Sequence, residues 1–242
     1  MKEFYKKPIP QQERWLWEDI ERIVIKECGE KLIPLSLYPE KILVRPQYVL
    51  QGINGALIEC FARESVLKKL VEASKMLPEG FKIVIFDSWR PVKVQKELFD
   101  RYKKETAKSN PEKSNIELEN LVIQFVAFPS CDPQKPSPHS TGGAIDLTIA
   151  DSKGYYLDMG SEFDETTERS RTNYYENRGS RIMKIAYNRR LLYNIMTNVG
   201  FTNYPREWWH FDYGNQNWAW KTSNQYAIYG KAEPYLRWLK ES

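Results

Sequence analysis

The chain has 242 residues, of which 28% are charged and 41% hydrophobic, and its formal net charge is +4. This length allows one domain with a substantial core, and the composition is that of a globular protein and not of a disordered one. So small a positive charge, without a recognisable basic motif, argues against a dedicated nucleic-acid-binding protein.

The N-terminal residues and the cysteines indicate a cellular compartment. No apolar run of signal-peptide length follows Met1, and no stretch of about 18 uncharged apolar residues occurs. We therefore expect a soluble protein with no obvious export signal. The three cysteines, Cys28, Cys60 and Cys131, are odd in number and unrelated in spacing, which argues against a disulfide framework. A reducing cytoplasm and free thiols fit this pattern best.

The N-terminal third contains two stretches with apolar residues at helical spacing, separated by a stretch that contains several prolines. Residues 11–27 place Trp15 and Ile20 on one stripe, which predicts an amphipathic helix. Prolines then keep residues 31–47 extended or looped. A second helix is predicted over residues 64–77, where a Pro-Glu-Gly sequence follows its last apolar residue.

The β-rich run at residues 81–86 predicts a central strand, which delivers Asp87 and Arg90 at its end. A proline follows directly and suits the first turn of another helix. Residues 105–120 are polar and predict a surface connection, whereas residues 121–128 are apolar and predict a further strand.

The two histidines of the chain lie in short segments that each carry a carboxylate. His139 belongs to SPHSTGGAIDLT, which ends in a predicted strand over residues 144–149, and His210 belongs to EWWH. Because successive side chains of a strand face opposite sides, Asp146 shares a face with small residues and not with the apolar ones. Two imidazoles and one carboxylate are ligands that zinc accepts, and three protein ligands leave a fourth position for water. His139, Asp146 and His210 are therefore the candidate ligands of one zinc ion, although a histidine taken singly more often has an ordinary role.

Glu207 lies three residues before His210, so the two side chains would face opposite sides of a regular strand and could not both reach one metal ion. We therefore expect Glu207 to lie before the strand or at a bulge, with His210 inside the strand.

The C-terminal half begins with a long irregular stretch. Residues 151–180 show little periodicity, and we interpret them as a lid or pocket wall that carries Asp164. Residues 181–199 again repeat apolar residues at helical spacing before Gly200. An aromatic tail that we expect to wrap the sheet follows, with Trp218, Trp220, Tyr226, Tyr229, Tyr235 and Trp238.

The motifs together resemble the zinc D-alanyl-D-alanine dipeptidases, which belong with the D-Ala-D-Ala carboxypeptidases and the lysostaphin and hedgehog folds. The resemblance extends over residues 81–213, with a fainter match at residues 48–55. It is carried by SPHSTGGAIDLT at 137–148, EWWH at 207–210, DSWRP at 87–91 and MGSEFD at 159–164.

This resemblance implies roles for several side chains. Glu207 would be the general base and acid, and Arg90 would stabilise the oxyanion or bind a substrate carboxylate, between which the sequence does not decide. Ser137 would contact the substrate, and Asp164, with Tyr48, would receive its ammonium group. Asp87 is expected to orient Arg90 or a metal ligand, because metal sites usually need such partners.

We therefore expect a single α+β domain with a mainly antiparallel central sheet, helices packed on one side and a zinc cleft on the other. Within it, residues 1–60 would form an N-terminal helix and extended segment, 61–214 the catalytic core and 215–242 the aromatic tail. The expected function is zinc-dependent hydrolysis of D-Ala-D-Ala, a small dipeptide derived from peptidoglycan metabolism. The alternatives are a D,D-carboxypeptidase acting on longer peptidoglycan peptides and a non-catalytic zinc domain that binds a partner. The sequence does not fix the oligomeric state.

Overall fold

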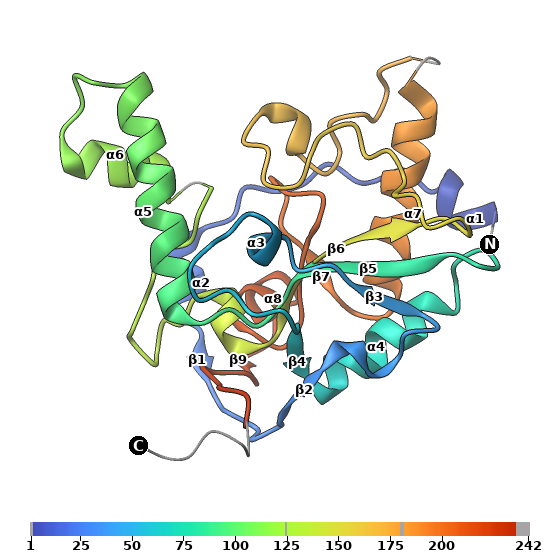
Figure 1. Ribbon diagram of the computed structural model, residues 1–242, viewed down its shortest axis with the longest axis horizontal. Helices are drawn as coiled ribbons and strands as arrows, with labels where there is room; N and C mark the ends of the chain where they lie inside the picture. Colours follow the sequence, from blue (N-terminus) through green and yellow to red (C-terminus); the bar gives the residue numbers. More distant parts are fainter. Residues whose placement is uncertain (1, 124, 180–181, 236–242) are drawn as a thin grey trace.

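The computed structural model describes residues 2–123, 125–179 and 182–235 (Figure 1). A five-stranded sheet has the order β3-β5-β6-β8-β7, in which β3 is parallel to β5 and the other neighbours are antiparallel. Its strands are β3 (Ile42–Val44), β5 (Lys82–Asp87), β6 (Ala144–Ala150), β8 (His210–Asp212) and β7 (Thr202–Asn203). The expected α+β fold with a mainly antiparallel sheet is confirmed.

Two helices cover one face of this sheet. They are α4 (Glu64–Ser74) and α7 (Met183–Asn198), close to the predicted ranges. Alternate residues of β6, Ile145, Leu147 and Ile149, are fully buried and share one core cluster with both helices. The intervening residues of β6, among them Asp146, point to the opposite face. The expected arrangement, with helices on one side and a cleft on the other, is therefore confirmed.

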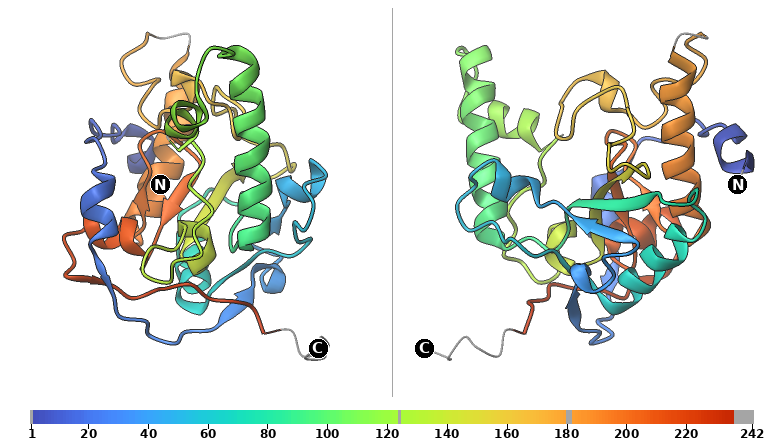
Figure 2. Two further views of the ribbon diagram at one scale, coloured as in Figure 1. Left: turned by 90° about the vertical axis from the view of Figure 1, so that its left-hand side faces the viewer. Right: turned by 45° about the vertical axis from the view of Figure 1, so that its right-hand side comes forward.

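Two other helices project from the body of the molecule, the first where the sequence predicted a helix after Pro91 and the second where it predicted a polar connection and a strand. They are α5 (Val92–Ser109) and α6 (Asn115–Val122), which pack together away from α7 (Figures 1 and 2). Ser114 and Glu117 form a capping box that begins α6. Residues 105–120 lie largely at the surface, as predicted, but most of them are helical. The strand predicted over residues 121–128 is wrong for the described residues, and residue 124 lies outside them. Leu118 and Val122 are both buried on one face of α6, because residues four apart share a helical face. The apolar run that begins at residue 121 was too short to show this helical spacing.

The predicted N-terminal helix over residues 11–27 is much shorter in the structure. Only α2 (Trp17–Glu21) is helical, and β1 (Val24–Ile25) pairs in parallel with β9 (Tyr226–Ala227). Pairing with a distant segment therefore overrides the local helical pattern. The remaining elements of this half are α1 (Lys2–Lys6) on α7, β2 (Leu32–Pro34) paired with β4 (Phe61–Arg63), η1 (Leu35–Leu37) and α3 (Gln47–Leu50).

The aromatic tail packs on the body over most of its described length. Trp218, in α8 (Gln216–Lys221), contacts Tyr213, and Trp220 contacts Trp15 of the N-terminal segment. Tyr229 is buried against Tyr213, whereas Tyr235 is exposed, and Trp238 lies outside the described residues. Among the described residues, no helix has the length and apolar character needed to span a membrane. The internal division at residues 60 and 214 stays a prediction.

The packing of α4 and α7 on β6 predicts a large difference between two isoleucines. Ile149 is 0% exposed in the core and Ile58 is 81% exposed. Ile149→Ala should lower the free energy of unfolding by about 2–5 kcal/mol, because it leaves a cavity between sheet and helices. The matched Ile58→Ala should change it by less than about 0.5 kcal/mol. Urea unfolding followed by tryptophan fluorescence measures both, and equal effects would contradict this packing.

Candidate metal and catalytic site

Three neighbouring strands place acidic and imidazole side chains in one row. Asp146 of β6 is the ladder partner of His210 in β8, and Asp87 at the end of β5 pairs with Asp146 on its other side. The register of β5 shifts between Ile85 and Asp87, which re-aims the end of this strand. The row therefore lies on the face of the sheet opposite the isoleucine core.

His139 reaches this row from a different kind of element. It lies in η2 (Pro138–Thr141), a short 3-10 helix with proline at its start, and Gly142 ends it with a φ of 70°. This left-handed conformation suits glycine and lets the chain turn directly into β6. The turn brings His139, Asp146 and His210 together, and all three are buried.

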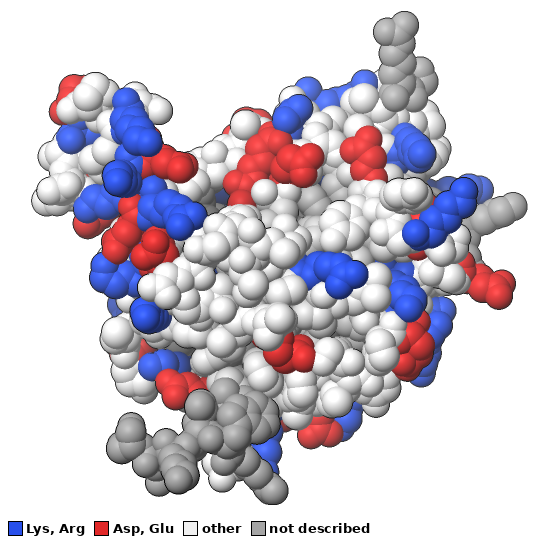
Figure 3. All heavy atoms as spheres, viewed as in Figure 1, with Lys and Arg blue, Asp and Glu red and all other residues white. Residues whose placement is uncertain are grey.

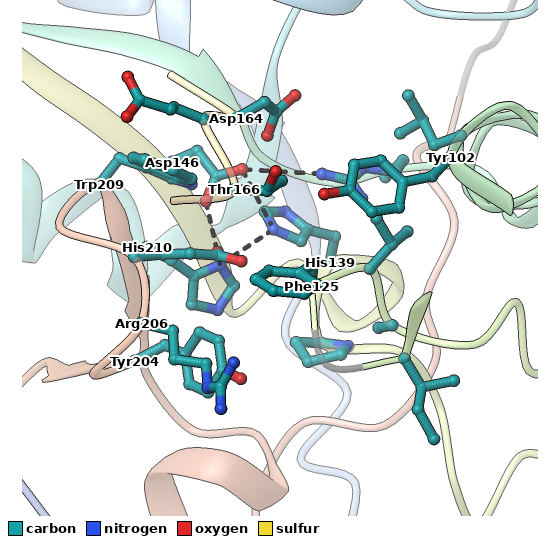
Figure 4. Close-up of a pocket in the computed structure, with 18 of the residues that line it drawn as sticks. Tyr102, Phe125, His139, Asp146, Asp164, Thr166, Tyr204, Arg206, Trp209 and His210 are labelled. Atoms are coloured by element: carbon teal, nitrogen blue, oxygen red, sulfur yellow. Dashed lines mark hydrogen bonds and ion pairs between the residues drawn. The ribbon is translucent and has the colours of Figure 1, made fainter. Parts of the chain in front are cut away.

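The three side chains lie close enough together to share one metal ion. Ligand atoms about 2.0–2.2 Å from such an ion are about 3.3–3.5 Å apart. His139 Nε2 lies 3.3 Å from His210 Nδ1 and 3.4 Å from Asp146 Oδ2, and His210 Nδ1 lies 3.0 Å from Asp146 Oδ1. The structure thus assembles the ligand set predicted from the sequence into a site able to hold a metal ion (Figure 4).

Hydrogen bonds to the outer nitrogens orient both imidazoles. His139 Nδ1 lies 2.7 Å from the carbonyl oxygen of Ser88, and His210 Nε2 lies 3.1 Å from Asp212 Oδ2. If the inner nitrogens hold a metal ion, the single proton of each neutral imidazole belongs on these two outer nitrogens, whose partners accept it. The inner nitrogens of His139 and His210 then keep their lone pairs for a metal ion.

Asp212 is a site residue that the sequence reasoning missed. Its side chain is fully buried and also accepts hydrogen bonds from Asn215 Nδ2 and Asn217 Nδ2. The period of a strand carried the signal, because a residue two positions after His210 shares its face.

Arg90 is held beside the candidate metal ligands by several partners. Its Nε donates to Asp87 Oδ2 at 2.9 Å, and one terminal nitrogen donates to Gln95 Oε1 at 2.7 Å. The other terminal nitrogen lies 3.2 Å from Tyr48 Oη and 3.6 Å from Asp146 Oδ2. Asp87 Oδ2 is also 3.2 Å from His139 Nδ1, so Asp87 contacts both Arg90 and a candidate metal ligand, the two groups that it was expected to orient.

Glu207 lies before the regular strand, as the spacing argument required. Strand β8 begins at His210, and the backbone N–H of Glu207 donates to the carbonyl of Tyr204 in the preceding turn. Its Oε2 is 3.9 Å from His210 Nδ1. Burial raises the pKa of Glu207 to about 8, and a cation bound by the neighbouring ligands would lower it.

Asp164 faces the same cavity from the long irregular stretch. Its φ is 60°, and its Oδ1 accepts a hydrogen bond of 3.3 Å from Tyr48 Oη. Burial, and next the charge of Asp146, raise the pKa of Asp164 to about 7. Thr166, two residues later, lines the same cavity as Tyr102 of α5. Residues 164–168 therefore form a wall of the cavity, as expected for this stretch.

The cavity has a volume of about 350 Å³, within the range of sites for small ligands. His139, Asp146 and His210 line it, and α5 and the segment after α6 contribute outer walls. The molecular surface is hollowed between the projecting α5–α6 pair and the body (Figure 3). Ser137 is buried at the start of η2 but is not among the described residues that line the cavity. Its contact with substrate stays a prediction.

Comparison with known proteins gives a consistent result. Residues 50–229 match the family described as D-Ala-D-Ala dipeptidase. A D-alanyl-D-alanine dipeptidase of Synechocystis sp. is 34% identical over 235 residues, which is 87% of this chain and 95% of the relative. One of Escherichia coli K12 is 37% identical over 189 residues, 75% of this chain and 84% of the relative.

A crystal structure of a vancomycin resistance D,D-pentapeptidase in complex with Zn(II) is similar at a TM-score of 0.40 and 16% identity, over 70% of this chain and 81% of that chain. A likeness this weak says nothing about the site. The family match over residues 50–229 and the identity with full-length relatives carry the assignment. The chain therefore belongs to the D-Ala-D-Ala dipeptidase family of peptidases.

Proposed function

We propose that the protein hydrolyses the free dipeptide D-Ala-D-Ala to two D-alanines with one zinc ion held by His139, Asp146 and His210. One observation carries the proposal: the ligand set lines a single cavity together with Glu207 and Asp164. The names of the relatives support the same substrate.

Bound zinc makes a water molecule acidic enough to supply hydroxide near neutral pH. Glu207 is the buried carboxylate next to His210, and it would take a proton from the attacking water and return it to the leaving amine. Arg90 is fixed beside Asp146, so its guanidinium can stabilise negative charge that develops on the attacked carbonyl oxygen. Retention of both Glu207 and Arg90 argues against a non-catalytic zinc domain.

Asp164 and Tyr48 form the receptor that we propose for the substrate ammonium group. Their hydrogen bond places a buried carboxylate at the cavity wall, where a cationic partner would offset the cost of its burial. A D,D-carboxypeptidase substrate carries an amide nitrogen at this position and gives Asp164 no charge to bind. The free dipeptide is therefore favoured over longer peptidoglycan peptides. Ser137 stays the proposed further contact.

The cytoplasm is the compartment that we propose. Cys28, Cys60 and Cys131 are all free thiols, which is usual in a reducing environment. The substrate would then be a small dipeptide from peptidoglycan metabolism, with neither nucleic acid nor membrane as partner.

Replacement of the general base should separate chemistry from metal binding. Glu207→Gln should lower the turnover of D-Ala-D-Ala about 10²–10⁴-fold and keep one zinc per chain, because the amide cannot accept the proton. His210→Ala should lose the metal. D-alanine release and zinc analysis measure the two effects, and Glu105→Gln, at the outer cavity wall, is the matched control. Full turnover by Glu207→Gln would exclude the proposed mechanism.

The carboxylate behind His210 should control metal affinity. Asp212→Asn should weaken zinc binding about 10- to 100-fold, because the amide is a poorer acceptor for the proton of His210 Nε2. Competition with a fluorescent chelator measures the dissociation constant. The exposed Asp100→Asn in α5 is the control and should bind zinc as the unaltered protein does. An unchanged affinity in Asp212→Asn would rule out this role.

Recognition of the ammonium group should depend on Asp164 and on pH. The anion is lost as pH falls through the pKa of Asp164, which is about 7 without a bound cation and lower with one, so kcat/KM for the dipeptide should fall on acidification through that pKa. Asp164→Asn should raise KM about 10- to 100-fold for the free dipeptide and leave N-acetyl-D-Ala-D-Ala unaffected. Equal losses on both substrates would refute the ammonium contact.

A further inference from the structure

We propose that Arg206 binds the C-terminal carboxylate of the dipeptide, at the opposite end of the cavity from Asp164. This inference rests on the proposed function. It assigns a substrate-binding role to a residue that the sequence analysis did not single out.

The chemistry of the substrate requires a cation at a particular place. A free dipeptide is a zwitterion, and its second residue carries both the leaving amine and the carboxylate. The group that returns a proton to the amine must therefore lie near the group that binds the carboxylate. Arg206 directly precedes Glu207 in the chain, and both side chains line the cavity.

The other arginines that line the cavity already have carboxylate partners. Arg90 is bonded to Asp87, and Arg101 of α5 lies 3.8 Å from Glu97. Arg171 pairs with Glu168. Arg206 forms no ion pair with any carboxylate of the described residues, so its charge is available to a ligand. Arginine suits this role, because its fork of donors matches a carboxylate.

A neighbouring ring holds the Arg206 guanidinium at the cavity. Its central carbon lies 5.6 Å from the centre of the Phe125 ring, within the range of a cation–π contact. Phe125 in turn packs against Tyr102 of α5, with ring centres 6.1 Å apart. Stacking on a ring uses the face of the guanidinium and leaves the N–H groups at its edge free to donate.

The two ends of the cavity then carry opposite charges. In Figure 4, Asp164 lies on one side of Asp146 and His210, and Arg206 lies on the other side with Tyr204. An ammonium group at Asp164 and a carboxylate at Arg206 would place the peptide bond between them, beside the metal ligands. The pair therefore selects a substrate with both termini free.

A comparison of two variants on two substrates tests the assignment. The unaltered enzyme should prefer D-Ala-D-Ala over its C-terminal amide, which lacks the negative charge. Arg206→Met should lower kcat/KM for the acid about 10- to 100-fold, mainly through KM, and change the amide little. Arg206→Lys keeps a charge without the fork and should fall between. Arg101→Met is the matched control, because Arg101 lines the same cavity but is already paired, and it should retain the preference.

The outcomes separate this assignment from the proposed function. If the unaltered enzyme hydrolyses the dipeptide and both Arg206 variants keep its full preference for the acid, the carboxylate binds elsewhere and the assignment fails alone. If the unaltered enzyme does not hydrolyse the dipeptide, the proposed function fails and the assignment with it. Zinc content and thermal unfolding of each variant identify misfolded protein, and Arg206→Lys supplies the decisive comparison if Arg206→Met does not fold.

Discussion

The register between β6 and β8 is the constraint on which the site depends. Asp146 and His210 are direct partners in this ladder, and Asp87 of β5 is the partner of Asp146 on the other side. Because side chains alternate along a strand, a slip of one residue would turn Asp146 into the isoleucine core and expose an apolar residue to the cavity. The packing of Ile145 and Leu147 under α4 and α7 therefore also fixes the position of Asp146, the proposed metal ligand.

This row of side chains is rich in negative charge. Asp87, Asp146 and Asp212 are each tied to an imidazole or to Arg90, and Glu207 and Asp164 lie in the same cavity. Buried carboxylates are costly unless cations or hydrogen bonds compensate them. Arg90 supplies one positive charge, and a divalent ion would supply two more at the point where the ligands meet. Metal binding and the stability of this half of the fold are for this reason expected to be coupled.

The sequence predicted the elements whose signals are local. The strand with Asp146, the strand that ends at Asp87 and the two helices over the sheet all have clear periodicity and clear stops. The placement of Glu207 before β8 followed from side-chain geometry alone. The described residues of 121–128 were misassigned as a strand because a short apolar run has no period of its own. The predicted length of the helix at residues 11–27 was too great because β1 pairs with the distant β9. Asp212 could have been found from the strand period, two residues after His210, whereas the contact of Gln95 with Arg90 depends on tertiary packing that no local pattern contains.

A hydrogen-bond chain through Tyr48 joins Asp164, which we propose for substrate recognition, to Arg90, which we propose for catalysis. Tyr48 Oη lies between Asp164 Oδ1 and Arg90, and its ring also stacks with the Arg90 guanidinium at 4.7 Å. An ammonium group bound at Asp164 would fix the orientation of the Asp164 carboxylate, and this carboxylate would fix the direction of the Tyr48 hydroxyl proton. The Tyr48 oxygen would then hold Arg90 in position to face the reacting carbonyl. A substrate without this group would leave the chain less ordered at the transition state. Such a substrate would therefore be hydrolysed more slowly as well as bound more weakly, because binding energy from its amino end would no longer help to orient the reacting bond.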